Sequence, residues 1–324
     1  MVVSGTSLFA GTSSGVFRST NNGASWAAVN SGLTNIYIES LTLSGTNIFA
    51  GTTNGIFVSS NNGSNWASVS TGLPNEIVNS IMGLGSDLFA GTGGSGVYRS
   101  TNNGTSWFAV NSGLTSDYVY SFAVIGVDLF AATYEGLFRT SNNGANWNIV
   151  NSGLPATSVY ALCISDSNLF AGTYSNGVFL STNKGESWSA VNTGLNTMNI
   201  FSLAVLGTNL FSGTDKGVWR RPLTEVIGIE NISTEIPSEY RLFQNYPNPF
   251  NPSTNIRIQL SKSGFVSMKV YDITGKEVAV LVNQELNAGV YNVDFNASNL
   301  SSGTYFYSME TEGFRDVKKM VIVK

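Results

Sequence analysis

The stretch Ser19-Thr-Asn-Asn-Gly-Ala-Ser-Trp26 is the first of five similar eight-residue phrases in this chain, and these phrases decide its fold. A second phrase, Leu8-Phe-Ala-Gly-Thr12 or a near copy, precedes each tryptophan phrase and occurs a sixth time from Leu210. The chain therefore has five full repeats and a sixth that lacks the tryptophan phrase. The five phrases end 40, 41, 40 and 41 residues apart, at Trp26, Trp66, Trp107, Trp147 and Trp188.

A period of about 40 residues occurs both in helical repeats and in four-stranded blades. Composition separates the two, because each unit is dense in Gly, Asn, Ser and Thr and no unit has the i, i+3, i+4, i+7 pattern of a helix. In the unit 35–74, strands are expected at 38–43, 48–52, 56–59 and 66–69, with Asn-Gly pairs at the turns. Four short antiparallel strands per unit are typical of a β-propeller blade.

Charge density locates a domain boundary. Residues 1–222 contain 16 charged side chains, residues 223–324 contain 20, and five of the seven prolines lie between 222 and 252. The predicted fold is all-β, with a β-propeller of at least six four-stranded blades followed by a small Ig-like β-sandwich. The propeller is expected at 1–222, a linker at 223–240 and the second domain at 241–324. The expected blades are about 1–34, 35–74, 75–115, 116–155, 156–196 and 197–227, with 223–227 as the candidate last strand.

Composition excludes several kinds of chemistry. The chain has no His and one Cys, so it has neither a Ser-His-Asp triad nor a His/Cys zinc site, and no disulfide forms within it. A net charge of −4 and a pI of about 4.9 argue against nucleic-acid binding. Cys163 lies in an apolar strand and is expected to be a buried core residue. No cofactor is predicted.

Each tryptophan phrase resembles the Asp-box, S-x-D-x-G-x-x-W, of neuraminidase-like and sortilin-type propellers. The resemblance implies a hairpin between the third and fourth strands of a blade, distant from any active site. The Asx side chain would cap the turn, Gly would take the left-handed conformation and Trp would pack at the blade edge. Asn replaces Asp in every copy, which removes the charged oxygen that Ca²⁺ prefers, so no metal site is predicted. The structural residues are Ser19, Asn21, Gly23, Trp26, Asn61, Gly63, Trp66, Asn102, Gly104, Trp107, Asn142, Gly144, Trp147, Asn183, Gly185 and Trp188.

Most carboxylates and several tyrosines of the propeller are expected on one face, which is formed by the second-to-third-strand loops and the inter-blade loops. Propeller ligands usually bind on this face, an analogy at the level of the fold. The candidate residues are Tyr37, Glu39, Glu76, Asp117, Tyr118, Tyr134, Glu135, Tyr174, Asp215 and Lys216. A non-enzymatic binding face is the main hypothesis. The alternatives are a glycosidase that uses two of these carboxylates, about 5–9.5 Å apart, and a purely structural spacer.

A sialidase-like activity would need three arginines around a substrate carboxylate. Arg18, Arg99 and Arg139 are present, but they occupy the same repeated position after the third-strand aromatic residue. A residue that is repeated from blade to blade is expected to be part of the scaffold. No catalytic residue is therefore assigned.

The C-terminal segment alternates apolar and polar residues, as in Ile256-Arg-Ile258-Gln-Leu260, which predicts a small β-sandwich. It resembles the type A C-terminal sorting domain of the type IX (Por) secretion system in phrases such as Leu242–Thr254, Val270–Val278 and the terminal Lys318–Lys324. A generic Ig-like adhesive module is the alternative. The residues assigned to the sorting signal are Asn245, Tyr246, Pro247, Asn248, Pro249, Phe250, Gly275, Gly303, Lys318, Lys319 and Lys324.

The resemblance implies a partner and a location. The partner is the outer-membrane machinery of type IX secretion, and the protein is expected outside the cell or on its outer surface. In the family the sorting domain is commonly removed, and an exposed linker at 223–240 would suit cleavage. A complete unit carries a loop and a strand before its Leu-Phe-Ala-Gly-Thr phrase, as in Gly32 to Leu43, whereas the first has only Met1 to Ser4 at this place, so an upstream segment with a signal peptide is expected beyond the given sequence.

Overall fold

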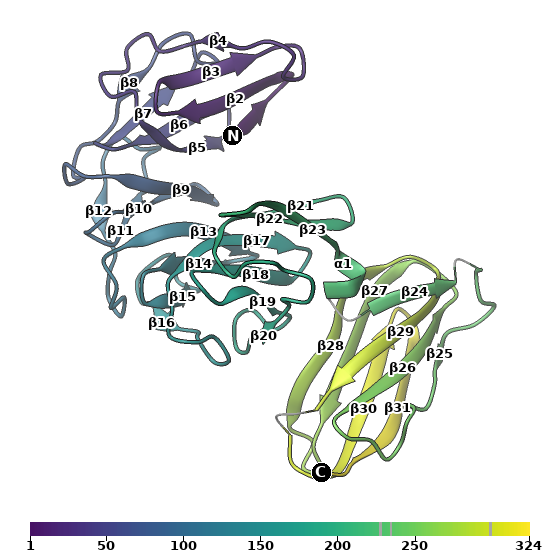
Figure 1. Cartoon of the computed structure of the whole chain (residues 1–324). Coiled ribbons are helices and arrows are strands. Elements are labelled where there is room, and N and C mark those ends of the chain that lie inside the picture. The colour runs from purple at the N-terminus through teal and green to yellow at the C-terminus, as the bar shows by residue number, and fades with distance from the viewer. Residues whose placement is uncertain (227–228, 234, 298–299) are drawn as a thin grey trace.

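The computed structural model describes residues 1–324 except 227–228, 234 and 298–299. Six antiparallel sheets follow one another along an open arc, and a two-sheet sandwich follows them (Figure 1). None of the helices in the described residues is long and apolar enough to cross a membrane. The strands of the first three blades are β1 (Val2–Ser4), β2 (Ser7–Thr12), β3 (Gly15–Ser19), β4 (Ala27–Ala28), β5 (Ile38–Ser44), β6 (Asn47–Thr52), β7 (Ile56–Ser59), β8 (Ala67–Ser68), β9 (Val78–Leu84), β10 (Asp87–Thr92), β11 (Val97–Ser100) and β12 (Phe108–Ala109).

The next two blades repeat this order and the sixth has three strands, so the expected all-β propeller fold is confirmed. The strands are β13 (Val119–Ile125), β14 (Asp128–Thr133), β15 (Gly136–Thr140), β16 (Asn148–Ile149), β17 (Val159–Ser165), β18 (Asn168–Thr173), β19 (Gly177–Ser181), β20 (Ser189–Ala190), β21 (Ile200–Leu206), β22 (Asn209–Thr214) and β23 (Gly217–Pro222). The second strand of each inner blade is the most buried, because the Leu-Phe-Ala-Gly-Thr phrase packs on both sides.

The five tryptophan phrases form turns with one hydrogen-bond pattern, and we call them the tryptophan turns (19–26, 59–66, 100–107, 140–147 and 181–188). In the first, the Ser19 hydroxyl donates to Asn21 Oδ1 at 2.9 Å, and the amide of Gly23 donates to Ser19 Oγ at 2.9 Å. Asn22 and Gly23 both have positive φ angles, of 56° and 87°. Asparagine and glycine tolerate this conformation best, which explains their place in the phrase.

Tryptophans of the later turns join neighbouring blades. The indole N–H groups of Trp66, Trp107, Trp147 and Trp188 donate to the carbonyls of Val29, Val69, Val110 and Val150 in the preceding blades, at 2.7–2.8 Å. These four side chains are buried. Trp26 in the first blade donates to its own turn, at Gly23 O, and is 38% exposed. Each joint therefore combines an apolar contact with a hydrogen bond.

The sixth blade differs from the expected four strands. It has three strands, and residues 223–226 form the short helix α1 (Leu223–Val226), while residue 227 lies outside the described residues. Pro222 is the last residue of the strand, and the amide of Leu223 still donates to Thr208 O at 2.8 Å before the chain turns into the helix. Val226 is buried against Phe170 and Leu210, and the partly buried Trp219 packs at the same place. The helix thus covers the core where the other blades use a tryptophan turn.

Part of the expected linker belongs to the sandwich, which corrects its boundary. Strand β24 (Ile229–Ser233) pairs with β29 (Gly289–Asn296). The first sheet has the order β24-β29-β26-β25, with β26 (Ser253–Leu260) and β25 (Arg241–Leu242). The second has the order β28-β27-β30-β31, with β28 (Glu277–Leu286), β27 (Gly264–Tyr271), β30 (Gly303–Thr311) and β31 (Phe314–Ile322). The pairing is short and joins segments some 60 residues apart, so the local sequence around 229–233 does not predict it.

Alternate residues of the sandwich strands build its core, as the period of two predicts. Ile256, Ile258 and Leu260 of β26 are fully buried and face Met268 of β27 and Met309 of β30. These apolar side chains form one cluster with no member from the propeller. The sandwich therefore has its own hydrophobic core.

Tyr307→Phe tests the polar part of this core. The buried Tyr307 hydroxyl donates to Phe243 O and accepts from the amide of Asn245, both at 2.8 Å, and burial raises the pKa of this phenol to about 12. Removing the Tyr307 hydroxyl leaves the Phe243 carbonyl and the Asn245 amide without this partner. We therefore expect the free energy of unfolding of the sandwich to fall by about 2 kcal/mol. Urea denaturation followed by tyrosine fluorescence measures the change. Tyr246→Phe is the control, because its ring is 82% exposed, and an equal effect of both variants would contradict the prediction.

Candidate ligand-binding face of the propeller

From the second blade onward, the first strand of each blade carries a β-bulge at the same repeated position. The register jumps from Ile38 to Ser40 in β5, and the same jump occurs in β9, β13, β17 and β21. A bulge leaves one residue out of the ladder and redirects its side chain, and bulges are frequent beside functional sites. The residues at the bulge position are Glu39, Asn79, Tyr120, Tyr160 and Phe201.

Aromatic rings gather around the bulges of the last three blades. Tyr120 and Tyr160 meet edge to face with ring centroids 4.7 Å apart, and the Phe201 ring lies 6.1 Å from Tyr160 with an angle of 17° between their planes. Tyr174 lies 5.8 Å from Tyr160. Tyr118 and Tyr134 form a second pair at 6.4 Å. We call these six residues the aromatic strip.

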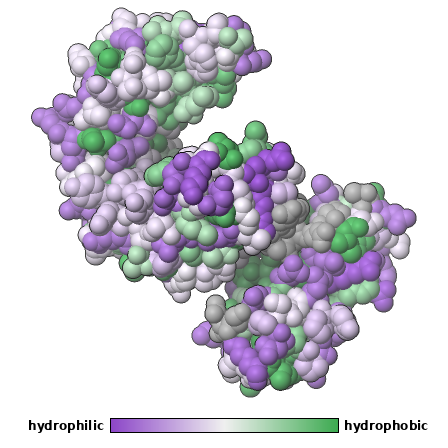
Figure 2. Space-filling model, in the orientation of Figure 1, coloured by the Kyte–Doolittle hydropathy of each residue, from purple (hydrophilic) through white to green (hydrophobic). Residues whose placement is uncertain are grey.

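The strip is accessible to solvent. Tyr118, Tyr134, Tyr174 and Phe201 are 49–60% exposed, while Tyr120 and Tyr160 are partly buried. Burial raises the pKa of Tyr120, and the neighbouring phenols of Tyr160, Tyr134 and Tyr118 raise it further. On the face seen in Figure 2, the most hydrophobic residues form small patches among polar ones. The aromatic strip is defined by its ring contacts, one pair and one group of four.

Hydrogen bonds bring the predicted loops together. In the second to fifth blades, the turn between the second and third strands donates a backbone hydrogen bond to the segment before the first strand, as in Thr53 N to Tyr37 O at 3.2 Å and Tyr134 N to Tyr118 O at 3.1 Å. Gly96 N similarly donates to Asp117 O of the next blade at 2.8 Å. The prediction that Glu39 lies in an inter-blade loop is wrong. Glu39 lies within β5, at the bulge.

Carboxylates on these loops are tied to neighbouring polar side chains. Glu135 accepts from Thr115 at 2.9 Å. Asp215 accepts from Thr197 at 2.6 Å and from Asn199 at 3.2 Å, and these bonds hold its pKa below its usual range. The exposed Lys216 follows it in the same turn, and Glu76 lies over Gly94 with one carboxylate oxygen buried. The described residues contain no group of three His, Cys, Asp or Glu side chains that could hold a metal ion.

Sequence reasoning missed Tyr120, Tyr160 and Phe201. Period-two alternation in a regular strand does not show where a bulge turns a residue toward the binding face. A signal was nevertheless present, since the bulge residues 39, 79, 120, 160 and 201 recur with the 40- and 41-residue spacing of the tryptophans. Comparing the repeats position by position would have found them.

The arginines at the repeated position after the third-strand aromatic residue belong to the scaffold. Arg99 pairs with Asp87, and Arg139 pairs with Asp128 at 3.0 Å in the same blade. Lys184 of the next blade also reaches Asp128, at 3.0 Å. Arg18 donates to Ser7 at 3.1 Å. These side chains lie beside the turns between the first and second strands, so they form no arginine cluster for a substrate carboxylate.

Asp128→Asn tests the cross-blade ion pair. The Asp128 side chain is almost fully buried, whereas Arg139 and Lys184 are partly exposed and can turn to water. We therefore expect a loss of about 2 kcal/mol in the free energy of unfolding, less than for a fully buried pair. Asp87→Asn is the control and should lose less, because Arg99 is the one ion-pair partner of Asp87 among the described residues. Urea denaturation measures both, and an equal loss would exclude a contribution from Lys184.

Cys163 lies in β17, partly buried against the core of the last two blades. Burial raises the pKa of its thiol to about 12. The thiolate is the reactive form, so Cys163 is a poor nucleophile in the folded protein. Its location agrees with a role in packing.

Residues assigned to the sorting signal divide into structural and exposed groups. Asn245 is buried and donates to Pro247 O and Thr254 Oγ1, both at 3.0 Å, while Phe250 is in the core. Asn248 Oδ1 accepts from the amide of Val321 at 2.9 Å. Exposed side chains are Tyr246, Lys319 and Lys324. Pro247 and Pro249 flank Asn248, Gly275 and Gly303 lie at turns or strand ends, and Lys318 pairs with Asp316 at 3.2 Å.

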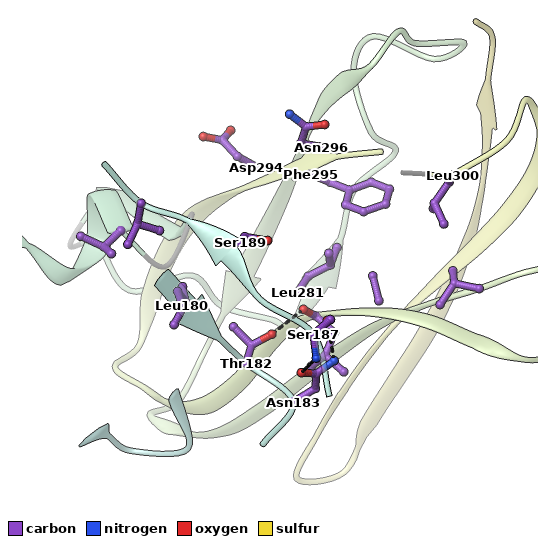
Figure 3. A pocket seen from close by; sticks show the side chains of 15 residues that line it. Leu180, Thr182, Asn183, Ser187, Ser189, Leu281, Asp294, Phe295, Asn296 and Leu300 are labelled. Atoms are coloured by element: carbon purple, nitrogen blue, oxygen red, sulfur yellow. Dashed lines mark hydrogen bonds between the residues drawn. The ribbon is translucent and has the colours of Figure 1, made fainter. Parts of the chain in front are cut away.

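A cavity of about 380 Å³ lies between the fifth blade and the sandwich (Figure 3). Leu180, Thr182 and Asn183 line it from the propeller, and Leu281 and Phe295 from the sandwich. Thr182 Oγ1 donates to Val280 O at 3.1 Å, and Ser167 Oγ donates to Asn283 O. The cavity has one carboxylate, Asp294, and no cation in its lining. Its geometry is that of a contact between domains.

Comparison with known proteins identifies the class of the C-terminal sandwich domain. Residues 244–323 match the Por secretion tail family, described as a secretion system C-terminal sorting domain. The sandwich is thus a type IX sorting domain, which implies secretion to the cell surface or the extracellular space. No curated protein sequence matches the chain.

Solved structures similar to this chain include several β-propellers. The extracellular domain of the hybrid two component system BT4673 from B. thetaiotaomicron has a TM-score of 0.55 and 12% identity, over 98% of this chain and 48% of the other. The present chain thus spans about half of that structure. The WD40 propeller of Doa1 has a TM-score of 0.53 and 13% identity, over 65% and 72% of the two chains. YCF48 bound to D1 peptide has a TM-score of 0.51 and 16% identity, over 64% and 72%. At these identities the likeness shows the fold alone.

Proposed function

We propose that this protein is exported by type IX secretion and carries its propeller outside the cell as a non-enzymatic binding module. The observation that supports this best is the combination of a sorting domain with an exposed aromatic strip on the face where propellers usually bind ligands. Half-exposed aromatic rings are common at binding surfaces, since they provide a large contact area with a polar group at one end. The outer-membrane secretion machinery is the proposed partner of the sandwich.

Export is tested with reporter fusions in a bacterium that has type IX secretion. One reporter carries a signal peptide before it and residues 229–324 after it, so that β24 is included. We expect this reporter outside the cell in the wild-type strain and inside a strain that lacks the machinery. Export in both strains, or in neither, would contradict the proposed route. A second fusion with residues 241–324 lacks β24 and should be exported less, because β29 loses its edge partner.

The enzymatic alternative needs a carboxylic acid that stays protonated near neutral pH. Hydrogen bonds from Thr197 and Asn199 lower the pKa of Asp215, which favours the ionised form and disfavours this role. We expect the full chain to release no reducing sugar from a panel of polysaccharides, and Glu135→Ala and Asp215→Ala to behave in the same way. Turnover by the wild type that either substitution abolishes would overturn the non-enzymatic reading.

A further inference from the structure

We infer that the aromatic strip, Tyr118, Tyr120, Tyr134, Tyr160, Tyr174 and Phe201, binds a neutral polysaccharide along the last three blades. This inference rests on the proposed function and adds the chemical class of the ligand. The first observation is the repeated bulge. It places the second residue of each blade's first strand at the same position on successive blades. Three consecutive blades place an aromatic ring there.

Geometry favours an extended ligand over a small enclosed one. Within each of the two groups, the centroids of contacting rings lie 4.7–6.4 Å apart, so the strip offers several contact points. Four of its six rings are about half exposed. A small ligand is usually held in a cavity that buries most of its surface, whereas a polymer gains affinity from many shallow contacts.

Chemistry of the strip matches a sugar chain. Each pyranose ring presents an apolar C–H face, which packs on an aromatic ring, and a rim of hydroxyl groups, which needs polar partners. Five of the six strip residues are tyrosines, which combine an apolar ring with a hydroxyl. At the bulges of the second and third blades, Glu39 and Asn79 continue the same line with hydrogen-bonding groups.

Charge on the face disfavours an acidic ligand. The surrounding loops carry Glu76, Asp117, Glu135 and Asp215 but only one cation, Lys216, among the predicted face residues. This arrangement repels uronic acids, sulfated sugars and nucleic acids. The strip itself contains no Asp, Glu, Lys or Arg, and the carboxylates of Glu135 and Asp215 accept hydrogen bonds from Thr115, Thr197 and Asn199. A neutral polysaccharide is not repelled by these carboxylates.

Affinity electrophoresis of the full chain in gels that contain one soluble polysaccharide tests the inference. The probes are hydroxyethyl cellulose, xylan, mannan and laminarin as neutral chains, alginate as an acidic one and chitosan as a cationic one. We expect retardation by at least one neutral probe, and a dissociation constant at least tenfold weaker in Tyr160→Ala, which contacts three other rings of the strip. Phe108→Ala is the control, because Phe108 is a similarly exposed ring on the outer strand β12 and should leave binding unchanged.

Tyr134→Ala is a second variant in case Tyr160→Ala disturbs the fold, since Tyr134 is a more exposed member of the strip. It should weaken binding as well. Retardation by alginate or chitosan alone, binding that both strip variants retain, or no retardation by any neutral probe would overturn the inference. A peptide array that the wild type binds and Tyr160→Ala does not would also overturn it. That last result would leave the proposed binding function intact, whereas polysaccharide hydrolysis would contradict the proposed function itself.

Discussion

Replacing Trp147 with alanine is expected to lower the free energy of unfolding of the propeller by about 4 kcal/mol. The indole is almost fully buried between the third and fourth blades, in one cluster with Phe89 and Phe138. Truncation of a buried Trp typically costs about 3–5 kcal/mol. The change also removes the donor of the 2.7 Å hydrogen bond to Val110 O, which leaves a carbonyl at the joint unpaired. Thermal unfolding monitored by circular dichroism should show a decrease in Tm of about 8–15 °C.

Trp26→Ala is the matched control for this prediction. Trp26 ends the same turn sequence, but it is 38% exposed and bonds within its own turn. Its removal is expected to cost about 1 kcal/mol, because it makes no joint with a preceding blade. If the two variants lost equal stability, the tryptophan would act within its own turn, and the proposed role in joining blades would be wrong.

Gly113→Ala is expected to cost about 3 kcal/mol at the same joint. Gly113 has a φ of 81°, and a Cβ added there would lie 2.3 Å from the carbonyl oxygen of Trp147. Because that oxygen is part of the backbone, the two blades must move apart. The movement would stretch the 2.8 Å hydrogen bond from the amide of Trp147 to Ser112 O. Left-handed backbone alone costs a non-glycine residue about 1–2 kcal/mol, and the contact adds to it.

Gly126→Ala separates the two contributions. Gly126 also has a positive φ, of 65°, but a Cβ there would meet nothing within 4 Å. We expect a loss of about 1 kcal/mol, so the difference between the variants measures the contact with Trp147. Guanidinium denaturation of both variants gives the comparison. A Gly113→Ala variant as stable as Gly126→Ala would show that the blade joint adapts without cost.

Much of the propeller could be predicted because each blade repeats the same local signals. In the second blade the expected strands 38–43, 48–52 and 56–59 agree with β5, β6 and β7 to within one residue at each end. Turn residues with positive φ, such as Asn62 and Gly63, separate the third and fourth strands. Local sequence decides such features, since few residue types accept these backbone angles.

Features that depend on contacts between distant segments could not be predicted in this way. The pairing of β24 with β29 depends on Val290, Tyr291 and Val293, which lie far along the chain from 229–233. Helix α1 forms where Val226 fills the space beside Phe170, and four residues give no helical period. The aromatic strip depends on bulges, whose positions follow from pairing with the second strand. In each case the partner, and not the segment itself, determines the conformation.

Because the indole hydrogen bonds join adjacent blades, the stability of the propeller is approximately the sum of contributions from single blades and from the joints between neighbouring blades. The second, third and fourth blades each receive an indole from the next blade and give one to the preceding blade, so the stability of each depends on two adjacent joints. A chain of units that interact only with their neighbours unfolds most readily from its ends, in the manner of a one-dimensional cooperative lattice. The first blade has one such joint, and the aromatic strip lies on blades whose last member is covered by α1. Local opening near the sorting domain would therefore disturb the aromatic strip before it altered the far end of the arc.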